Sequence, residues 1–326
     1  MNPDYFKKVF GIENRTKYFV HVLVYLLVIS VAIFALFIIG TASLNKKGGV
    51  AVKEKINYFE NLNLEGKGIM VFDVINNREI FSQNPDMPLP LASLTKIMTV
   101  VTTNGKLDNN QKIKITKEDL GPEGDSKLVV GDSWRASDLR DFTLITSSND
   151  GAFALAAVAK SEQTAPPYNN ASTSPEELKN QFVEEMNETA SQIGLSNSKF
   201  FNEHGLDRAT NMGGAYGSAR DMATLFEYAL KNYPEILEAT RYKSIEFNSD
   251  KETYVGENTN TVVDKIPNLI ASKTGYTDLA GGNLVIAFDA GLNRPIIISI
   301  LGSTAEGRFA DALKLIGATI KELPNL

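Results

Sequence analysis

The sequence contains no cysteine, two histidines and one tryptophan among its 326 residues. Without cysteine the chain can form no disulfide, no thiolate metal site and no cysteine nucleophile. The two histidines are His21 and His204, so a metal site with several histidine ligands is excluded. A Ser-His-Asp triad would have to use His204.

Basic charge is also in short supply. The 39 acidic residues outnumber the 33 lysines and arginines, which gives a net charge of -6. Phosphate binding needs a basic face, and no dense run of lysines and arginines could build one, so nucleic acid is not expected as a partner. The hydrophobic fraction of 43% and the charged fraction of 22% are ordinary for a globular protein of one or two domains.

The longest uncharged apolar run spans residues 18–40. As a helix it rises about 1.5 Å per residue, about enough to cross a hydrocarbon layer of ~30 Å. A cleaved signal peptide is the alternative, but its apolar core normally has only ~7–15 residues. We therefore expect a cytoplasmic tail at 1–17, an uncleaved transmembrane helix at 18–40 and a linker at 41–57. Lysines and arginines flank both ends, so the positive-inside rule gives no orientation.

Strand patterns occur near both ends of the remaining chain. Two β-type runs at 68–74 and 78–82 flank an Asn-Asn turn and predict a hairpin. Toward the C-terminus, three more runs precede an amphipathic helix at about 305–321; they cover 268–275, 282–288 and 294–301. Helical patterns lie between, at 91–101, 136–147, 149–160, 175–193 and 219–232. A flexible surface loop is expected at 161–175. This order predicts an α+β fold in which both ends of the chain build one antiparallel sheet around an inserted helical region.

Residues 93–96 form an S-x-x-K motif. On a helix, residues i and i+3 share a face, so Lys96 can reach the hydroxyl of Ser93. Serine is a weak nucleophile that needs an adjacent base, and a lysine can serve if burial or a second cation lowers its pKa. The same pattern at 43–46 abuts the membrane helix, and that at 196–199 lies in a polar stretch. Of the three matches, only the motif at 93–96 follows prolines and begins an apolar helix. The alternative interpretation of this motif is a chance match on an ordinary helix.

Two further motifs are S-x-N at residues 147–149 and K-T-G at residues 273–275. The first stands between two helical patterns and could bring two polar side chains to one pocket, although a helix cap is the plainer interpretation. The second leads a strand. Its lysine and threonine could donate to a carboxylate and its glycine could let a substrate backbone approach, whereas an edge-strand lysine beside a turn is the alternative.

The three motifs follow one another with gaps of 54 and 126 residues. In this order the sequence resembles the penicillin-recognising serine enzymes. The stretches LASLTKIMT, LITSSNDGAFALA, FNEHGLD, GSARDMATL and SKTGYTDLAGGNLV are similar to low-molecular-mass D-alanyl-D-alanine carboxypeptidases, serine peptidase family S11, from about residue 65 onward. The resemblance implies a β-lactamase/DD-peptidase-like fold with a five-stranded antiparallel sheet, in a catalytic domain at 58–326 whose helical subdomain covers about 91–235.

The resemblance also implies roles for the first two motifs. Ser93 is expected to be the acylated nucleophile, and Lys96 its general base. Ser147 and Asn149 are expected to relay protons and to hold the substrate peptide. Ser148 stands where related carboxypeptidases often have glycine, and we expect no loss from this small residue.

The remaining roles fall near the C-terminus. Lys273 and Thr274 are expected to bind the terminal carboxylate of the substrate, beside Gly275. The oxyanion hole is expected to use the backbone N–H of Tyr276 together with that of the nucleophile, and Arg308 is expected near the carboxylate. A tyrosine at 276 replaces the histidine common in the family, which puts fine substrate preference in doubt.

His204 is expected to be structural, because the family uses lysine as its base. Asp207 and Asp221 are expected to be local hydrogen-bond partners. Many relatives continue into a β-rich domain with an amphipathic anchor, and we expect the N-terminal span to take the place of that anchor.

The function implied by the resemblance is that of a penicillin-sensitive serine D-Ala-D-Ala carboxypeptidase. It would trim peptidoglycan stem peptides outside the cytoplasm, as a single-pass bacterial membrane protein, with no metal or organic cofactor. β-Lactams would be covalent inhibitors. A DD-endopeptidase acting on cross-links uses the same residues and stays open. A class A β-lactamase would need an E-x-x-L-N loop that the sequence lacks, and a catalytically silent wall-binding scaffold would not need Lys96.

Overall fold

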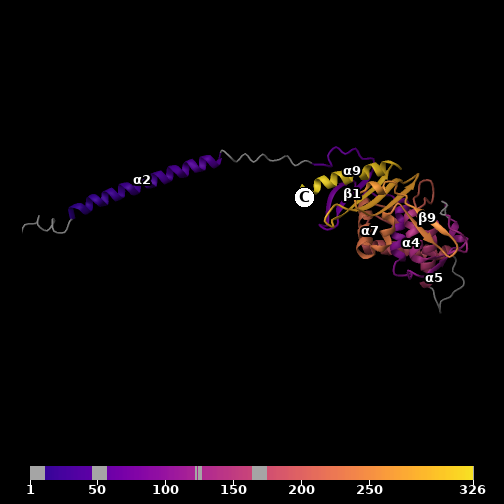
Figure 1. The fold of residues 1–326 in the computed structure, drawn as a ribbon. Coiled ribbons are helices and arrows are strands. Elements are labelled where there is room, and N and C mark those ends of the chain that lie inside the picture. The colour runs from indigo at the N-terminus through magenta and orange to yellow at the C-terminus, as the bar shows by residue number, and fades with distance from the viewer. Residues whose placement is uncertain (1–11, 46–56, 122, 124–126, 164–174, 326) are drawn as a thin grey trace, which may run out of the picture. The chain divides into compact units, whose positions relative to one another are not determined.

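The computed structural model describes residues 12–45, 57–121, 123, 127–163 and 175–325 (Figure 1). The chain divides into two compact units, Met1–Ile56 and Asn57–Leu326. The first unit contains helix α2 (Ile12–Asn45). Side chains of this helix are described for residues 20–36, and the large apolar ones among them are exposed.

Within the part of the chain that the structure describes, no helix combines the length and the apolar character needed to cross a membrane. The transmembrane helix predicted for residues 18–40 is therefore not confirmed. The predicted linker at 41–57 overlaps the end of this helix, because α2 continues to Asn45. Residues 46–56 and residues 1–11 of the predicted tail lie outside the described residues.

The second unit is built on a five-stranded sheet with the order β10-β11-β12-β1-β2. Every neighbouring pair is antiparallel. The strands are β1 (Gly68–Asp73), β2 (Arg78–Gln83), β10 (Leu269–Thr277), β11 (Gly281–Asp289) and β12 (Pro295–Ser303). Strands from both ends of the unit therefore meet at the β12–β1 pair, where Ile69 lies opposite Ile300. The predicted α+β fold is confirmed, and so is the prediction that both ends of the catalytic chain build an antiparallel sheet of five strands.

Both faces of the sheet are buried, and the side chains of β12 alternate between them. Ile296, Ile298 and Ile300 belong to the core under α9 (Gly307–Glu322), whereas Ile297 and Leu301 belong to the core shared with the other helices. This follows from the two-residue period of a strand. The result is three layers, with α9 on one face and the helical region, including α4, α5 and α7, on the other (Figure 1).

The predicted helices are present in the inserted region. They are α3 (Thr95–Thr103), α4 (Ala136–Thr146), α5 (Asn149–Gln163), α6 (Pro175–Ile193) and α7 (Ala219–Asn232). The predicted loop at 161–175 is shorter than expected at its start, because α5 continues to Gln163; residues 164–174 lie outside the described residues.

Several short elements were not predicted, because two to five residues carry too little of a period to be recognised. The short strands are β3 (Leu89–Pro90), β4 (Lys112–Lys114), β5 (Ser133–Arg135), β6 (Lys199–Phe200), β7 (Ala215–Gly217), β8 (Ser244–Asn248) and β9 (Thr253–Glu257). The short helices are η1 (Ala92–Leu94), η2 (Glu118–Leu120), α8 (Glu235–Glu238), η3 (Ala239–Arg241), η4 (Val263–Lys265) and η5 (Leu323–Asn325).

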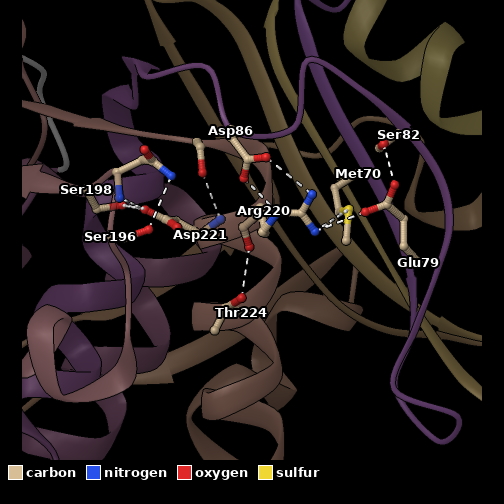
Figure 2. Close-up of polar contacts among 11 residues, drawn as sticks. Met70, Glu79, Ser82, Asp86, Ser196, Ser198, Arg220, Asp221 and Thr224 are labelled. Carbon is tan, nitrogen blue, oxygen red and sulfur yellow. Dashed lines mark hydrogen bonds and ion pairs between the residues drawn. The ribbon is translucent and has the colours of Figure 1, made fainter.

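Helix α7 is fixed to the sheet at its first turn, as Figure 2 shows. Arg220 donates from Nε to Asp86 Oδ1 at 2.7 Å and from Nη1 to Glu79 Oε2, on β2, at 3.0 Å. The next residue, Asp221, accepts from the hydroxyl of Ser198 at 2.8 Å (Figure 2). Asp221 is therefore a local hydrogen-bond partner, as predicted, and burial raises its pKa.

Candidate active site

Ser93 and Lys96 lie on consecutive turns at the junction of η1 and α3. Lys96 Nζ donates to Ser93 Oγ at 2.9 Å. Ala92, just before the serine, has φ of 48°, a left-handed conformation that is uncommon for a residue with a Cβ and stores strain. Its carbonyl oxygen accepts from the hydroxyl of Thr95 at 2.7 Å, which stabilises the turn.

The Lys96 ammonium is fully buried and has three acceptors. Besides the serine, Nζ donates to Asn149 Oδ1 and to the carbonyl oxygen of His204, both at 2.7 Å. Burial lowers the pKa of Lys96 to about 7, and the negative charge of Glu203 opposes this shift. A lysine that is partly neutral near pH 7 can accept a proton from a serine hydroxyl.

The S-x-N residues divide into two active-site groups and one cap. Ser147 ends α4 in the left-handed conformation, with φ of 63°. Ser148 accepts from the backbone N–H of Gly151 at 2.9 Å and so caps α5. Asn149 begins α5 and bonds to Lys96. The cap holds the two neighbours apart, so that Ser147 reaches the second lysine and Asn149 the first.

The K-T-G residues lie on β10, the edge strand beside η1. Lys273 Nζ donates to Ser147 Oγ and to the carbonyl oxygen of Thr274, both at 2.9 Å. Burial lowers the pKa of Lys273 well below its usual value, and the charges of Lys96 and Arg308 lower it further. The two buried lysines therefore do not both keep full charge near neutral pH.

Gly275, on β10, lies close to the turn that carries the serine. A Cβ on this glycine would stand 2.8 Å from the carbonyl oxygen of Leu91 and 3.1 Å from the backbone nitrogen of Ser93. Arg308, on α9, donates from Nη1 to the Gly275 carbonyl at 2.7 Å. Tyr276 follows, with 51% of its surface exposed.

His204 does not face the serine as a base. Its Nδ1 accepts from the backbone N–H of Leu206 at 3.0 Å, and its Nε2 lies 3.7 Å from Glu203 Oε1. Burial and the charges of Lys96 and Lys179 lower the pKa of His204 to about 3. The imidazole is neutral at physiological pH, and its backbone carbonyl is what contacts Lys96.

Sequence reasoning missed three further residues beside the motifs. Thr259 Oγ1 lies 2.5 Å from Thr274 Oγ1. Asn283, on β11, donates to the carbonyl of Pro90 at 2.9 Å and so fixes the segment before the serine. Glu203 is fully buried beside His204. Glu203 lies within FNEHGLD and Asn283 within SKTGYTDLAGGNLV, so both stood in stretches that carry the resemblance, whereas Thr259 lies outside them.

Among the described residues, no group of three or more histidine or carboxylate side chains could hold a metal ion. The site instead contains two linked groups: Lys96 bonds to Ser93 and Asn149, and Lys273 bonds to Ser147. A serine hydroxyl bonded to a buried lysine, next to a second serine–lysine pair, defines a class of serine acyl-transfer site whose base is lysine. The motifs predicted that these groups would lie together, and the structure links Ser93, Lys96 and Asn149 to one another and Ser147 to Lys273.

The comparisons with known proteins agree with this class. Residues 55–165 and 171–305 match the model of the peptidase S11 family, D-alanyl-D-alanine carboxypeptidase. The chain belongs to this family.

Individual relatives differ in how much of their length is matched. The chain is 32% identical to D-alanyl-D-alanine carboxypeptidase DacA of Haemophilus influenzae, over 72% of this chain and 56% of that protein. It is 29% identical to a D-alanyl-D-alanine endopeptidase of Escherichia coli, over 76% of this chain and 74% of that protein. Thus the chain spans little more than half of the first relative.

Solved structures share the fold. The ampicillin-bound penicillin-binding protein D2 of Listeria monocytogenes is 27% identical, with a TM-score of 0.64 over 79% of this chain and 98% of that one. A Streptomyces K15 DD-transpeptidase variant is 21% identical, with a TM-score of 0.70 over 80% of this chain and 99% of that one, and shows the fold alone.

Proposed function

We propose that this chain is a serine D-alanyl-D-alanine carboxypeptidase that removes the terminal D-alanine from peptidoglycan stem peptides. The observation that carries the proposal is the contact of Lys96 Nζ with Ser93 Oγ at 2.9 Å, made by a buried lysine with a pKa of about 7. Family membership supports the substrate class.

In the first step, Ser93 Oγ attacks the carbonyl carbon of the penultimate D-alanine while neutral Lys96 takes the hydroxyl proton. The tetrahedral intermediate then collapses to an ester on Ser93, and free D-alanine leaves after its nitrogen gains a proton. Ser147, bonded to Lys273, lies on the route by which that proton reaches the leaving group. Water next hydrolyses the ester with Lys96 as base, which restores the serine hydroxyl.

Two groups of donors complete the proposal. Lys273, Thr274 and the nearby Arg308 supply positive charge and a hydroxyl for the terminal carboxylate of the substrate. The backbone N–H groups of Ser93 and Tyr276 form the oxyanion hole. The close approach of Gly275 to η1 supports this pairing, and each such donor contributes about 10²–10³ in rate.

A DD-endopeptidase is the second candidate. Two relatives with that name, from Escherichia coli and Pseudomonas aeruginosa, are matched over 74% of their own lengths. Both reactions cleave a bond next to D-alanine through the same ester. They differ in the amine that leaves, which is free D-alanine in one case and a cross-linked side chain in the other.

Peptidoglycan lies outside the cytoplasm, so the catalytic unit is placed there in this proposal, and β-lactams are its expected covalent inhibitors. The ampicillin complex of the Listeria monocytogenes relative supports the second point. The structure does not confirm the predicted anchor at residues 18–40, and the proposed chemistry does not depend on it.

Intact-mass spectrometry of the full chain with benzylpenicillin tests the proposal. A stable adduct that maps to Ser93 and is absent from Ser93→Ala is expected. Rapid hydrolysis with little trapped adduct would indicate a β-lactamase, and neither adduct nor hydrolysis in folded protein would indicate a silent scaffold. Incubation with a stem pentapeptide and with a cross-linked dimer then separates the two peptidase candidates by their products.

A further inference from the structure

The loop at residues 202–206 is docked on α3 by two consecutive carbonyl groups. Lys96 and Thr99 are three residues apart and share one face of the helix. Thr99 Oγ1 donates to the carbonyl oxygen of Glu203 at 2.5 Å, and Lys96 Nζ donates to that of His204 at 2.7 Å. The loop therefore binds the same helix face that carries the amine of the site.

The loop has little freedom to move. Gly205 has φ of +86°, and a Cβ there would stand 2.0 Å from the carbonyl oxygen of Ala92, next to the serine. Asn202 closes the loop, because its side chain accepts from the N–H of Gly205 at 2.7 Å and donates to the carbonyl of Leu206 at 2.9 Å.

This closed loop carries a carboxylate into the interior. The Glu203 side chain is fully buried, and its Oε1 lies 3.7 Å from the imidazole Nε2 of His204. Burial of a carboxylate is costly unless nearby charge compensates it. Its negative charge acts on Lys96, whose amine is bonded to the carbonyl of the adjacent residue.

We propose that Glu203 is a positioning residue for the general base. Its buried carboxylate is carried by the loop whose carbonyl groups bond Thr99 and Lys96, and its charge favours the protonated form of the Lys96 amine. This inference rests on the proposed function, in which neutral Lys96 takes the proton of the nucleophile. Because an anion favours the protonated amine, Glu203 sets the pH at which acylation begins.

Other ionisable groups surround the same region. They are Lys273 on β10, Lys179 on α6 and His204 in the loop itself. Lys273 and Lys96 titrate as a pair, so the acid limb of the rate profile belongs to both. A change at Glu203 leaves all of these groups in place, and a displacement of the limb therefore reports the lost charge.

Glu203→Gln tests the proposal in the full chain. Acylation by a fluorescent penicillin is measured as a second-order rate constant from about pH 5 to about pH 9. The midpoint of the acid limb is expected to move down by about one unit, because the amine loses its proton more easily. The rate at pH 6 is then compared with the plateau rate of the same protein. This fraction is expected to be about five-fold larger in the variant than in the wild type. The plateau itself falls, because a weaker base is a poorer catalyst.

Thr99→Val is the matched control, since it removes the hydroxyl that holds the Glu203 carbonyl and leaves the charge unchanged. A slower rate at every pH with an unmoved midpoint is expected for it. If Glu203→Gln behaved in the same way, the role of Glu203 would be structural only and the proposal would be wrong. Should Glu203→Gln fail to fold, Glu203→Asp keeps the charge; a midpoint lowered by about one unit in that variant would also overturn the proposal.

Lys96→Ala separates this inference from the proposed function. If that variant is acylated at the wild-type rate, lysine is not the base and both proposals fail. If it is not acylated while the midpoint of Glu203→Gln equals that of the wild type, the proposed function stands and only the inference about Glu203 fails.

Discussion

Substitution of Gly275 by alanine tests how closely the edge of β10 must approach the nucleophile. Gly275 has no left-handed φ, so the methyl group of alanine adds no backbone strain of its own. The added Cβ would instead stand 2.8 Å from the carbonyl oxygen of Leu91 and 3.1 Å from the backbone nitrogens of Ser93 and Leu94. These contacts are backbone atoms of the turn that presents the serine, so no flexible side chain can give way.

The size of the effect follows from that geometry. To restore an ordinary contact of about 3.4 Å or more, the strand and the turn must separate by roughly half an ångström or more. Overpacking of this kind costs about 1–3 kcal/mol of the free energy of unfolding, which for a large domain lowers the melting temperature by about 2–4 °C per kcal/mol. A catalytic group displaced by about 1 Å can cost about 10²-fold in rate, so acylation is expected to fall by about ten- to a hundred-fold.

Acylation is measured with a fluorescent penicillin, and stability by thermal unfolding. Gly317→Ala is the matched control, because Gly317 lies in α9 with no atom within 4 Å of the added Cβ. Alanine there is expected to raise stability by up to about 1 kcal/mol, since it is the better helix former, and to leave acylation unchanged.

The decisive comparison is between rate and stability in the same protein. If Gly275→Ala is acylated at the wild-type rate and its melting temperature is unchanged, β10 does not approach the turn at Ser93 as closely as argued. A loss of stability without a loss of rate would keep the contact but show that the turn at Ser93 does not depend on it.

Three further predictions concern single side chains. Lys96→Ala is expected to slow penicillin acylation by about 10²–10⁴-fold, and the wild-type rate should rise with pH through about 7, where Lys96 becomes neutral; a flat wild-type profile between pH 6 and pH 8 would contradict this. Asn283→Ala removes the side-chain amide that bonds two backbone groups, so the free energy of unfolding measured in urea should fall by about 2–4 kcal/mol. A fall of less than about 1 kcal/mol would contradict this structural role. Thr259→Val removes the hydroxyl beside Thr274, so KM for a D-Ala-D-Ala peptide should rise several-fold at constant melting temperature; an unchanged KM would exclude a role in substrate binding.

The regular part of the fold was predictable because burial on two faces leaves a clear pattern. In β12 the side chains of Ile296, Ile298 and Ile300 fill one core and those of Ile297 and Leu301 the other, so most of the strand is apolar on both faces. The short hairpins were not predictable in the same way. Their strands are held by side chains that are far apart in the sequence. The ring centroids of Tyr254 on β9 and Trp134 on β5, for example, lie 4.7 Å apart, and such contacts leave no local pattern in the sequence.

The candidate site was predictable where its residues form motifs, whereas the loop carbonyl group and the buried carboxylate beside Lys96 were not predicted. The sequence indicated Ser93 and Lys96 directly. It gave no sign that Lys96 would also need the carbonyl of His204, because a carbonyl belongs to every residue and only the path of the loop brings this one to the amine. Glu203 was missed for a related reason, since a charged residue in a polar segment is usually solvated.

The S-x-N motif shows how two competing interpretations of one pattern can both hold. A helix cap and a pair of active-site groups were alternatives in the sequence, yet Ser148 caps α5 while Ser147 and Asn149 contact Lys273 and Lys96. The cap fixes the start of α5, and the left-handed backbone of Ser147 turns the chain between the two helices. The helix cap made by Ser148 therefore orients both of its neighbours. Ser147 contacts Lys273 on one side of the turn, and Asn149 contacts Lys96 on the other.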